Sequence, residues 1–192
     1  MFNLTFLEER IKRLEERNKK IEAELKKMGH NIADSQVLKP NILRFATEAK
    51  SLKELKVACV MDRFTFDSYK YECNIMQITP DNWKNEIDEF KPDILFIESA
   101  WEGKDKLWFR KIANGSKEFF EMASYCQDKN VPIILWNKED PIYTDTFMPV
   151  ARMSDFVFTT DIDCVKKYKD ELGHDNVFHL HFAAQPAIHN PI

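Results

Sequence analysis

Residues 93–98 read Asp-Ile-Leu-Phe-Ile-Glu, and residues 131–137 read Val-Pro-Ile-Ile-Leu-Trp-Asn. Both stretches hold short, unbroken apolar runs that end in polar residues, with no alternation of apolar and polar side chains. Continuous runs of this kind are typical of strands in parallel sheets, which helices cover on both faces. These two segments therefore indicate an α/β domain.

Apolar runs of the same kind recur along the chain, and amphipathic segments separate them. The predicted strands cover residues 57–61, 75–78, 94–97, 131–136, 155–159 and 177–182. The predicted helices cover residues 65–73, 80–90, 116–128 and 161–172. Thr79 and Pro80 are typical of the cap and the first residue of a helix. The alternation of strands and helices predicts a doubly wound, parallel, Rossmann-like sheet over residues 56–192.

Residues 1–29 precede this domain, and we expect them to form a coiled-coil helix. Apolar residues occupy the a and d positions of a heptad repeat over residues 4–28, with Asn18 as the exception at an a position. A lone Asn at this position fixes the register of a parallel pair of helices. We therefore expect a parallel homodimer through residues 4–28, and the alternative is a helix packed on its own domain. Residues 30–55 are interpreted as a connector.

Composition and charge narrow the functional classes. The chain has a formal net charge of -4, which argues against a nucleic-acid partner, and its four glycines form no phosphate-binding loop pattern. No stretch approaches the roughly 20 apolar residues of a membrane span, and the first residues lack the apolar run of a signal peptide. The four cysteines are typical of buried thiols in a reducing compartment, so we expect a cytoplasmic protein. His179 and His181 alone do not make a zinc site, so we expect no metal.

The residues that follow the predicted strands are rich in polar side chains, and ligands of open parallel sheets bind at this edge. The candidates for substrate binding are Asp62, Arg63, Trp101, Asn137, Lys138, Glu139 and Gln185. Glu98 directly follows an apolar strand, so its pKa is a candidate for elevation by burial. Carboxylates accept hydrogen bonds from sugar hydroxyls and an indole stacks on a sugar face, so this rim suits a hydroxyl-rich ligand.

Several of these candidates also have a purely structural interpretation. Asp62 and Arg63 are equally well explained by an ion pair with each other. A structural hydrogen bond explains Glu98 as well as a functional role does, and Trp101 is as often a plug in a loop as a stacking platform. Residues 136–141 have the strongest case for function, because no turn chemistry demands all of their polar and constrained residues.

Seven short stretches of the chain together resemble one known family. They are Met61-Asp-Arg-Phe-Thr, Lys70-Tyr-Glu-Cys-Asn, Gln77-Ile-Thr-Pro-Asp-Asn-Trp, Phe96-Ile-Glu-Ser-Ala-Trp, Trp136-Asn-Lys-Glu-Asp-Pro, Phe182-Ala-Ala-Gln-Pro and His189-Asn-Pro. In this order they resemble the amino-terminal domain of CgeB-type (spore maturation) glycosyltransferases. The resemblance covers about residues 56–192 and does not include the predicted coiled coil.

The resemblance implies a GT-B architecture, in which two Rossmann-like domains face each other across a cleft. The first domain serves a glycan or protein acceptor, and the second binds the nucleotide-sugar donor; no metal or other cofactor is implied. Asp140 would reach into the cleft, with Glu98 and Asp62 lining it, so Asp140 and Glu98 are the candidate catalytic carboxylates. We expect this chain to be the acceptor-side half and to be inactive alone, because the donor domain is missing from it and transfer needs both reactants in one geometry.

Two other functions stay open. One is a non-catalytic, dimeric binding or assembly module that keeps a sugar-binding rim. The other is a receiver-like signalling domain, since an acid follows the first strand and a lysine follows the fourth. This last interpretation is the weakest, because Asp62-Arg63 stands where an acidic pair is expected and Glu98 stands where an aspartate is expected.

Overall fold

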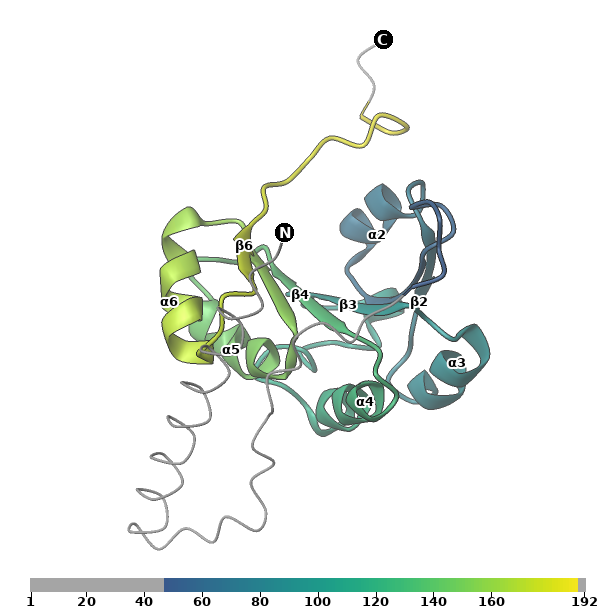
Figure 1. The fold of residues 1–192 in the computed structure, drawn as a ribbon, viewed down its shortest axis with the longest axis horizontal. Helices are drawn as coiled ribbons and strands as arrows, with labels where there is room; N and C mark the ends of the chain where they lie inside the picture. The colour runs from purple at the N-terminus through teal and green to yellow at the C-terminus, as the bar shows by residue number, and fades with distance from the viewer. Residues whose placement is uncertain (1–46, 190–192) are drawn as a thin grey trace, which may run out of the picture. The chain divides into compact units, whose positions relative to one another are not determined.

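The computed structural model describes residues 47–189, and Figure 1 shows how their elements are arranged. The predicted coiled coil and most of the predicted connector lie outside these described residues. Six strands form one sheet, and every neighbouring pair of strands is parallel. The prediction of a parallel α/β sheet is therefore confirmed.

Strands and helices alternate along the described chain. The strands are β1 (Lys56–Val60), β2 (Asn74–Gln77), β3 (Ile94–Glu98), β4 (Ile133–Asn137), β5 (Phe156–Thr159) and β6 (Val177–His179). The helices are α2 (Arg63–Tyr69), α3 (Trp83–Phe90), α4 (Lys117–Asp128), α5 (Thr144–Met153) and α6 (Ile162–Leu172), with a short 3-10 helix, η2, at Lys104–Lys106. Within this described range, no helix has the length and apolar character needed to cross a membrane.

The strand order determines where a ligand site is expected. The order across the sheet is β2-β1-β3-β4-β5-β6, so the chain first moves outward to β2 and then crosses back to the other side of β1. Right-handed connections then place α2 on one face of the sheet and α3, α4 and α5 on the opposite face (Figure 1). The direction reverses between β1 and β3, and ligands of such sheets bind at the carboxyl ends beside this point.

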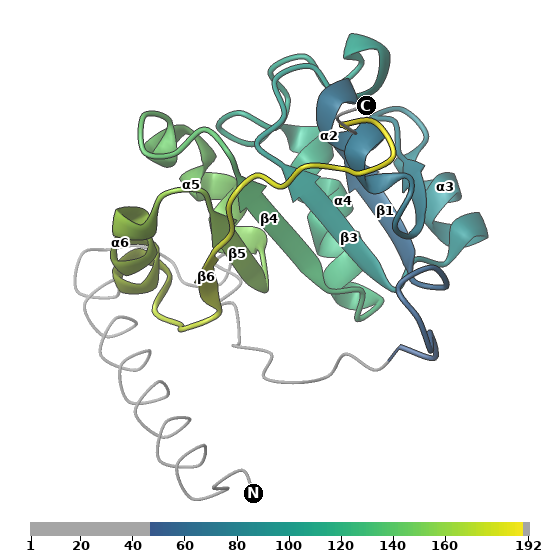
Figure 2. The same ribbon diagram turned by 90° about the horizontal axis from the view of Figure 1, so that it is seen from above.

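Successive strand residues point to opposite faces of the sheet and build two apolar clusters. In β3, Leu95 and Ile97 join the larger cluster with α3 to α6, whereas Phe96 joins the smaller cluster. The smaller cluster also contains Val57, Cys59, Met61 and Trp136, and residues of α2 pack against it. The carboxyl-terminal tail crosses the α2 face of the sheet (Figure 2).

Helix α5 was not predicted from the sequence. Pro149 lies inside it and removes one backbone donor, and such a residue signals a break when only the sequence is read. Phe147, Val150 and Ala151 are nevertheless spaced to form one buried face. Burial of this face against the sheet outweighs the cost of the proline.

Several predicted boundaries also differ from the structure: the helix predicted over residues 65–73 is α2 at Arg63–Tyr69, and the strand predicted over residues 131–136 is β4 at Ile133–Asn137. Helix α3 begins at Trp83, and Thr79 lies in a turn before it. The Thr79 backbone N–H and hydroxyl donate to the Glu86 carboxylate at 2.8 and 3.1 Å and tie this turn to the helix. The last strand ends at His179, and not at residue 182. After one more backbone bond, from Leu180 N–H to the Thr159 carbonyl at 2.8 Å, the chain leaves the sheet.

We call residues 180–186 the tail segment, and it is held at both ends. The Trp136 indole N–H donates to the Leu180 carbonyl at 3.2 Å. At the other end, the Gln185 side-chain amide donates to the Ser68 carbonyl and to the Glu72 carboxylate, each at 2.8 Å. The tail segment therefore bridges β4 and α2 (Figure 2).

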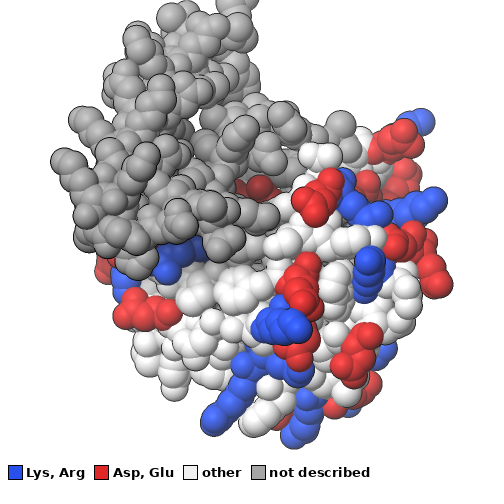
Figure 3. Space-filling model, turned by 90° about the horizontal axis from the view of Figure 1, so that it is seen from below, with Lys and Arg blue, Asp and Glu red and all other residues white. Residues whose placement is uncertain are grey.

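The face seen in Figure 3 carries interspersed positive and negative side chains in its described part. Ion pairs join opposite charges on the described surface, among them Lys129 with Asp88 at 2.9 Å and Lys117 with Glu121 at 3.7 Å. Because opposite charges are neighbours here, this part of the surface has little net field to attract a polyanion.

Candidate functional site

The carboxyl ends of β1, β3 and β4 bring Asp62, Glu98 and Lys138 together. Glu98 is 0% exposed, and its carboxylate accepts hydrogen bonds from the Asp62 backbone N–H at 2.8 Å and from the Thr65 hydroxyl at 2.7 Å. The Lys138 ammonium forms an ion pair with Glu98 and lies 3.7 Å from the Asp62 carboxylate. The strand-reversal point between β1 and β3 therefore holds a largely buried cluster of two carboxylates and one ammonium group.

Burial is the main influence on the pKa of Glu98. It raises that pKa above the ordinary glutamate value, and the charge of Lys138 and the hydrogen bonds from Lys138 and Thr65 oppose the rise. This is the direction that its position after an apolar strand predicts. Glu98 is 0% exposed, so its carboxylate contacts protein groups and does not face the solvent.

The Asp62 side chain orders the loop that follows β3. Its carboxylate accepts backbone N–H groups from Trp101 at 3.2 Å, Glu102 at 3.0 Å and Gly103 at 2.7 Å. Arg63 is not the partner of Asp62: its side chain is 95% exposed and pairs with Asp67 at 3.5 Å. The alternative of an Asp62–Arg63 ion pair is therefore wrong.

A second network surrounds Asp140 after the end of β4. Its carboxylate accepts hydrogen bonds from Thr159 at 2.6 Å, Thr144 at 2.7 Å, Asn137 at 2.9 Å and Tyr168 at 3.3 Å. The fully buried Asn137 amide also donates to the Tyr168 hydroxyl at 2.8 Å. Burial raises the pKa of Asp140, against the hydrogen bonds from Thr159, Thr144 and Tyr168. The network joins β4 and β5 to α5 and α6.

Glu139 and Trp101, like the exposed Arg63, are predicted rim residues that keep surface for a ligand. The Glu139 backbone N–H donates to the Asn137 side chain at 3.1 Å, whereas its carboxylate has no hydrogen bond or ion pair within residues 47–189. Trp101 is half-buried and packs edge-to-face on Tyr143 and Phe147, with ring centroids 5.1 and 5.5 Å apart. Trp101 therefore plugs its loop and keeps part of its indole exposed.

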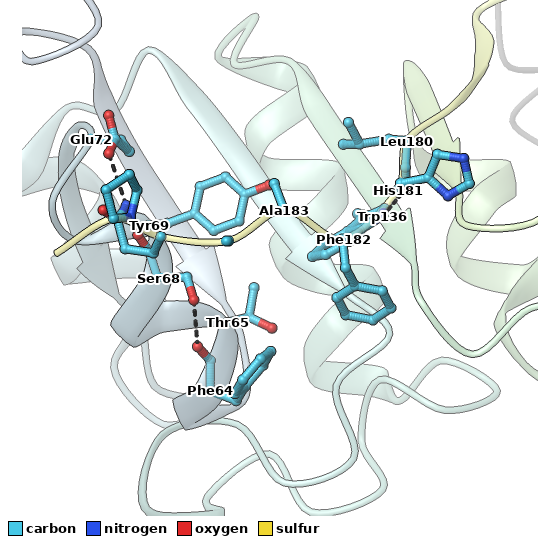
Figure 4. Close-up of a pocket in the computed structure, with 13 residues that line it drawn as sticks. Phe64, Thr65, Ser68, Tyr69, Glu72, Trp136, Leu180, His181, Phe182 and Ala183 are labelled. Atoms are coloured by element: carbon cyan, nitrogen blue, oxygen red, sulfur yellow. Dashed lines mark hydrogen bonds between the residues drawn. The ribbon is translucent and has the colours of Figure 1, made fainter. Parts of the chain in front are cut away.

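Gln185 lies apart from the other predicted residues, in the tail segment, and it lines a pocket that sequence reasoning missed. This pocket has a volume of about 270 Å³ and lies between α2, β4 and the tail segment (Figure 4). Its walls include Phe64, Tyr69, Trp136 and Phe182. These residues are far apart in the sequence, and no local pattern shows that the tail segment crosses back to α2.

The two histidines on and after β6 lie side by side. The rings of His179 and His181 have centroids 4.0 Å apart, and His179 Nε2 is 3.2 Å from the Thr160 carbonyl oxygen. In the part of the chain that the structure describes, no three His, Cys, Asp or Glu side chains gather as a metal site.

The fold and its rim define a class: a doubly wound, Rossmann-like α/β domain with polar groups at the carboxyl ends of its strands. The chain is similar to a curated protein, the spore protein CgeB of Bacillus subtilis (strain 168), with 27% identity over 72 residues. The match spans 38% of this chain and 22% of that protein, which suggests that the two are related over this part. No protein-family model and no solved structure matches the chain.

Proposed function

We propose that this chain is the acceptor-side, amino-terminal half of a GT-B glycosyltransferase, whose donor is bound by a second domain outside this chain. The similarity to CgeB and the Rossmann-like sheet are compatible with a glycosyltransferase-like domain. The observation that carries the proposal is the acidic rim at the strand ends, where such sheets bind ligands. Four carboxylates there, those of Asp62, Glu98, Glu139 and Asp140, outnumber the two cations, Lys138 and the exposed Arg63. Such a rim accepts hydrogen bonds from hydroxyl groups and repels a nucleotide diphosphate.

Within this proposal, Asp140 is the candidate proton acceptor for the acceptor hydroxyl. Its raised pKa lies closer to a working pH near neutrality than that of an ordinary aspartate. Oδ2 accepts a hydrogen bond from Thr159 alone among the described residues, so it keeps a lone pair for a ligand hydroxyl. As that hydroxyl oxygen bonds to the anomeric carbon of the donor, its proton passes to Asp140 and the nucleotide leaves with the electrons of the broken bond. Glu98 serves as a positioning residue for Asp62 and Lys138.

A ligand-detected NMR titration of the full chain against neutral glycans and nucleotide sugars tests this proposal. We expect glycans to bind and nucleotide sugars such as UDP-glucose not to bind. Glu139→Gln should weaken glycan binding about 5-fold or more, because it removes a charged acceptor that has no partner in the described structure. Binding of nucleotide sugars, with or without glycans, would overturn the proposal.

The alternative is a non-catalytic, dimeric binding or assembly module. The observation in its favour is that both candidate catalytic carboxylates already stabilise the fold. Glu98 is fully buried, and Asp140 accepts hydrogen bonds from four side chains. This module is the better account if no glycan binds while the chain remains a folded dimer.

The receiver-like alternative is not favoured by the geometry. Asp62, Glu98 and Lys138 do meet at the strand ends, as that interpretation requires. Glu98, however, is 0% exposed, and a phosphoacceptor must be reached by its phosphodonor.

Self-association through residues 4–28 is a separate proposal that concerns residues outside the described structure. Asn18→Leu should strengthen assembly and loosen its stoichiometry, because a buried Asn fixes register at a cost in stability. Sedimentation equilibrium and thermal unfolding of the two proteins measure both effects. An unchanged dimer mass together with unchanged stability would contradict the assignment of Asn18 to an a position.

A further inference from the structure

The pocket beside the tail segment has aromatic walls. Tyr69 and Phe182 each lie edge-to-face against Trp136, with ring centroids 6.3 and 5.1 Å away. Phe64 and Phe182 remain 59% and 53% exposed, although both line the pocket. Exposed aromatic side chains around a hollow offer apolar faces to a ligand.

Polar groups without protein partners border the same pocket. The Tyr69 hydroxyl makes no hydrogen bond to any described residue, and Figure 4 shows it directed toward the tail segment near Ala183. Glu72 uses Oε1 to accept from Gln185, which leaves Oε2 available. The peptide groups of residues 181–184 are exposed and have no backbone hydrogen bond inside the described chain. A hydroxyl-bearing ligand would therefore find both donors and acceptors.

The charge of the lining excludes one class of ligand. Glu72 is the acidic residue of the lining, His181 contributes an imidazole, and no lysine or arginine is among the residues that form it. A phosphate or carboxylate ligand would meet the Glu72 carboxylate, with no lysine or arginine in the lining to offset its charge. The pocket is therefore suited to a neutral ligand.

Thr65 connects this pocket to the rim. It lines the pocket, and its hydroxyl donates to Glu98 at 2.7 Å in the cluster at the strand-reversal point. A ligand in the pocket therefore lies beside the carboxyl ends of β1 and β3, where the proposed transfer site is.

We propose that this pocket binds one neutral sugar ring of the acceptor glycan. This inference rests on the proposed function, and it specifies where the acceptor binds and that the bound ring is uncharged. A volume of about 270 Å³ is at the lower end of ligand pockets, which suits a single ring. The C–H face of the ring packs on the exposed Phe182 and Phe64 side chains, and its hydroxyls pair with the Tyr69 hydroxyl, Glu72 and the peptide groups of the tail segment.

Isothermal titration of the full chain with methyl β-glucoside, methyl N-acetyl-β-glucosaminide and glucuronate tests this inference. We expect the two neutral glycosides to bind and glucuronate to bind at least 10-fold more weakly. Phe182→Ala and Tyr69→Phe should each weaken glycoside binding about 5-fold or more. Phe109→Ala is the matched control, because Phe109 is 56% exposed and is not part of the pocket, and it should leave the affinity unchanged.

The outcomes separate this inference from the proposed function. If glycosides bind, Glu139→Gln weakens them and both pocket variants leave the affinity unchanged, the pocket inference fails and the proposed function stands. If the pocket variants lose glycoside binding but nucleotide sugars also bind, the pocket is still the site of a neutral sugar ring, and the acceptor-side assignment fails. If choline binds in their place and Glu72→Gln abolishes its binding, the pocket is a cation site and the inference fails.

Discussion

Replacement of Lys138 by methionine is expected to lower the free energy of unfolding by about 3–5 kcal/mol at pH 7. The substitution keeps the aliphatic bulk of the side chain and removes the ammonium group. Glu98 would then be a buried carboxylate without a counter-charge, and such a group costs more than the ion pair itself contributes. Urea unfolding followed by tryptophan fluorescence measures the loss.

This loss should shrink as the pH falls. Burial already raises the pKa of Glu98 in the folded protein, and removal of Lys138 raises it further, since Lys138 lowers it. A carboxyl group with a raised folded pKa binds its proton more tightly in the folded state. Its favourable contribution is therefore present below the unfolded pKa of about 4.3 and is lost as the pH rises through the folded pKa. Lys138→Met should accordingly be closest to the parent protein in acid.

The double variant Lys138→Met, Glu98→Gln is the control for this interpretation. It removes both charges, so it should be more stable than Lys138→Met at pH 7. A Lys138→Met loss that is the same at pH 7 and pH 4, or a double variant no more stable than the single one, would contradict the role of the pair.

Asp140→Ala is expected to lower the free energy of unfolding by about 3 kcal/mol, whereas Glu139→Ala should change it by less than about 0.5 kcal/mol. The two carboxylates are neighbours in the chain, yet their surroundings differ. Asp140 accepts from Thr144, Thr159 and Asn137, and its loss would remove these three buried hydrogen bonds to a carboxylate at about 1 kcal/mol each. The Glu139 carboxylate has no partner in the described structure.

Thermal or urea unfolding of the two variants side by side gives this comparison. Equal stability of Asp140→Ala and Glu139→Ala would show that the network around Asp140 does not hold α5 to the sheet.

The difference in stability between these two variants also decides which of them is suited to binding studies. A loss of glycan binding in Asp140→Ala mixes a loss of structure with a loss of contact, so Glu139→Gln is the cleaner probe of the rim.

The sheet could be predicted because its strands are local apolar runs. Residues 94–97 and 131–136 are unbroken, and both became buried parallel strands. The strand order could not be read from the sequence, because it depends on crossovers between distant elements. Helix α5 was missed because Pro149 locally signals a break, whereas its apolar face is stabilised by the tertiary contacts of the sheet.

The sequence could predict where the candidate site lies, but not which of its side chains are buried and which are exposed. The rule that ligands bind at the carboxyl ends of strands brings Asp62, Glu98 and Lys138 together, and the structure places them in one cluster. Which carboxylate is enclosed and which is free depends on side-chain packing, so the difference between Asp140 and Glu139 could not be foreseen. The pocket depends on the return of the tail segment to α2, through contacts between residues such as Gln185 and Ser68 that are far apart in the chain.

Diffraction from crystals of the full chain soaked with a neutral glycoside, and separately with UDP-glucose, tests the acceptor-side assignment most directly. The assignment predicts density for the glycoside at the carboxyl ends of the strands, within reach of Glu139 or in the pocket beside the tail segment, and no density for UDP-glucose. Density for UDP-glucose at the strand ends, with its diphosphate held by the loops after β1, β3 or β4, would contradict it.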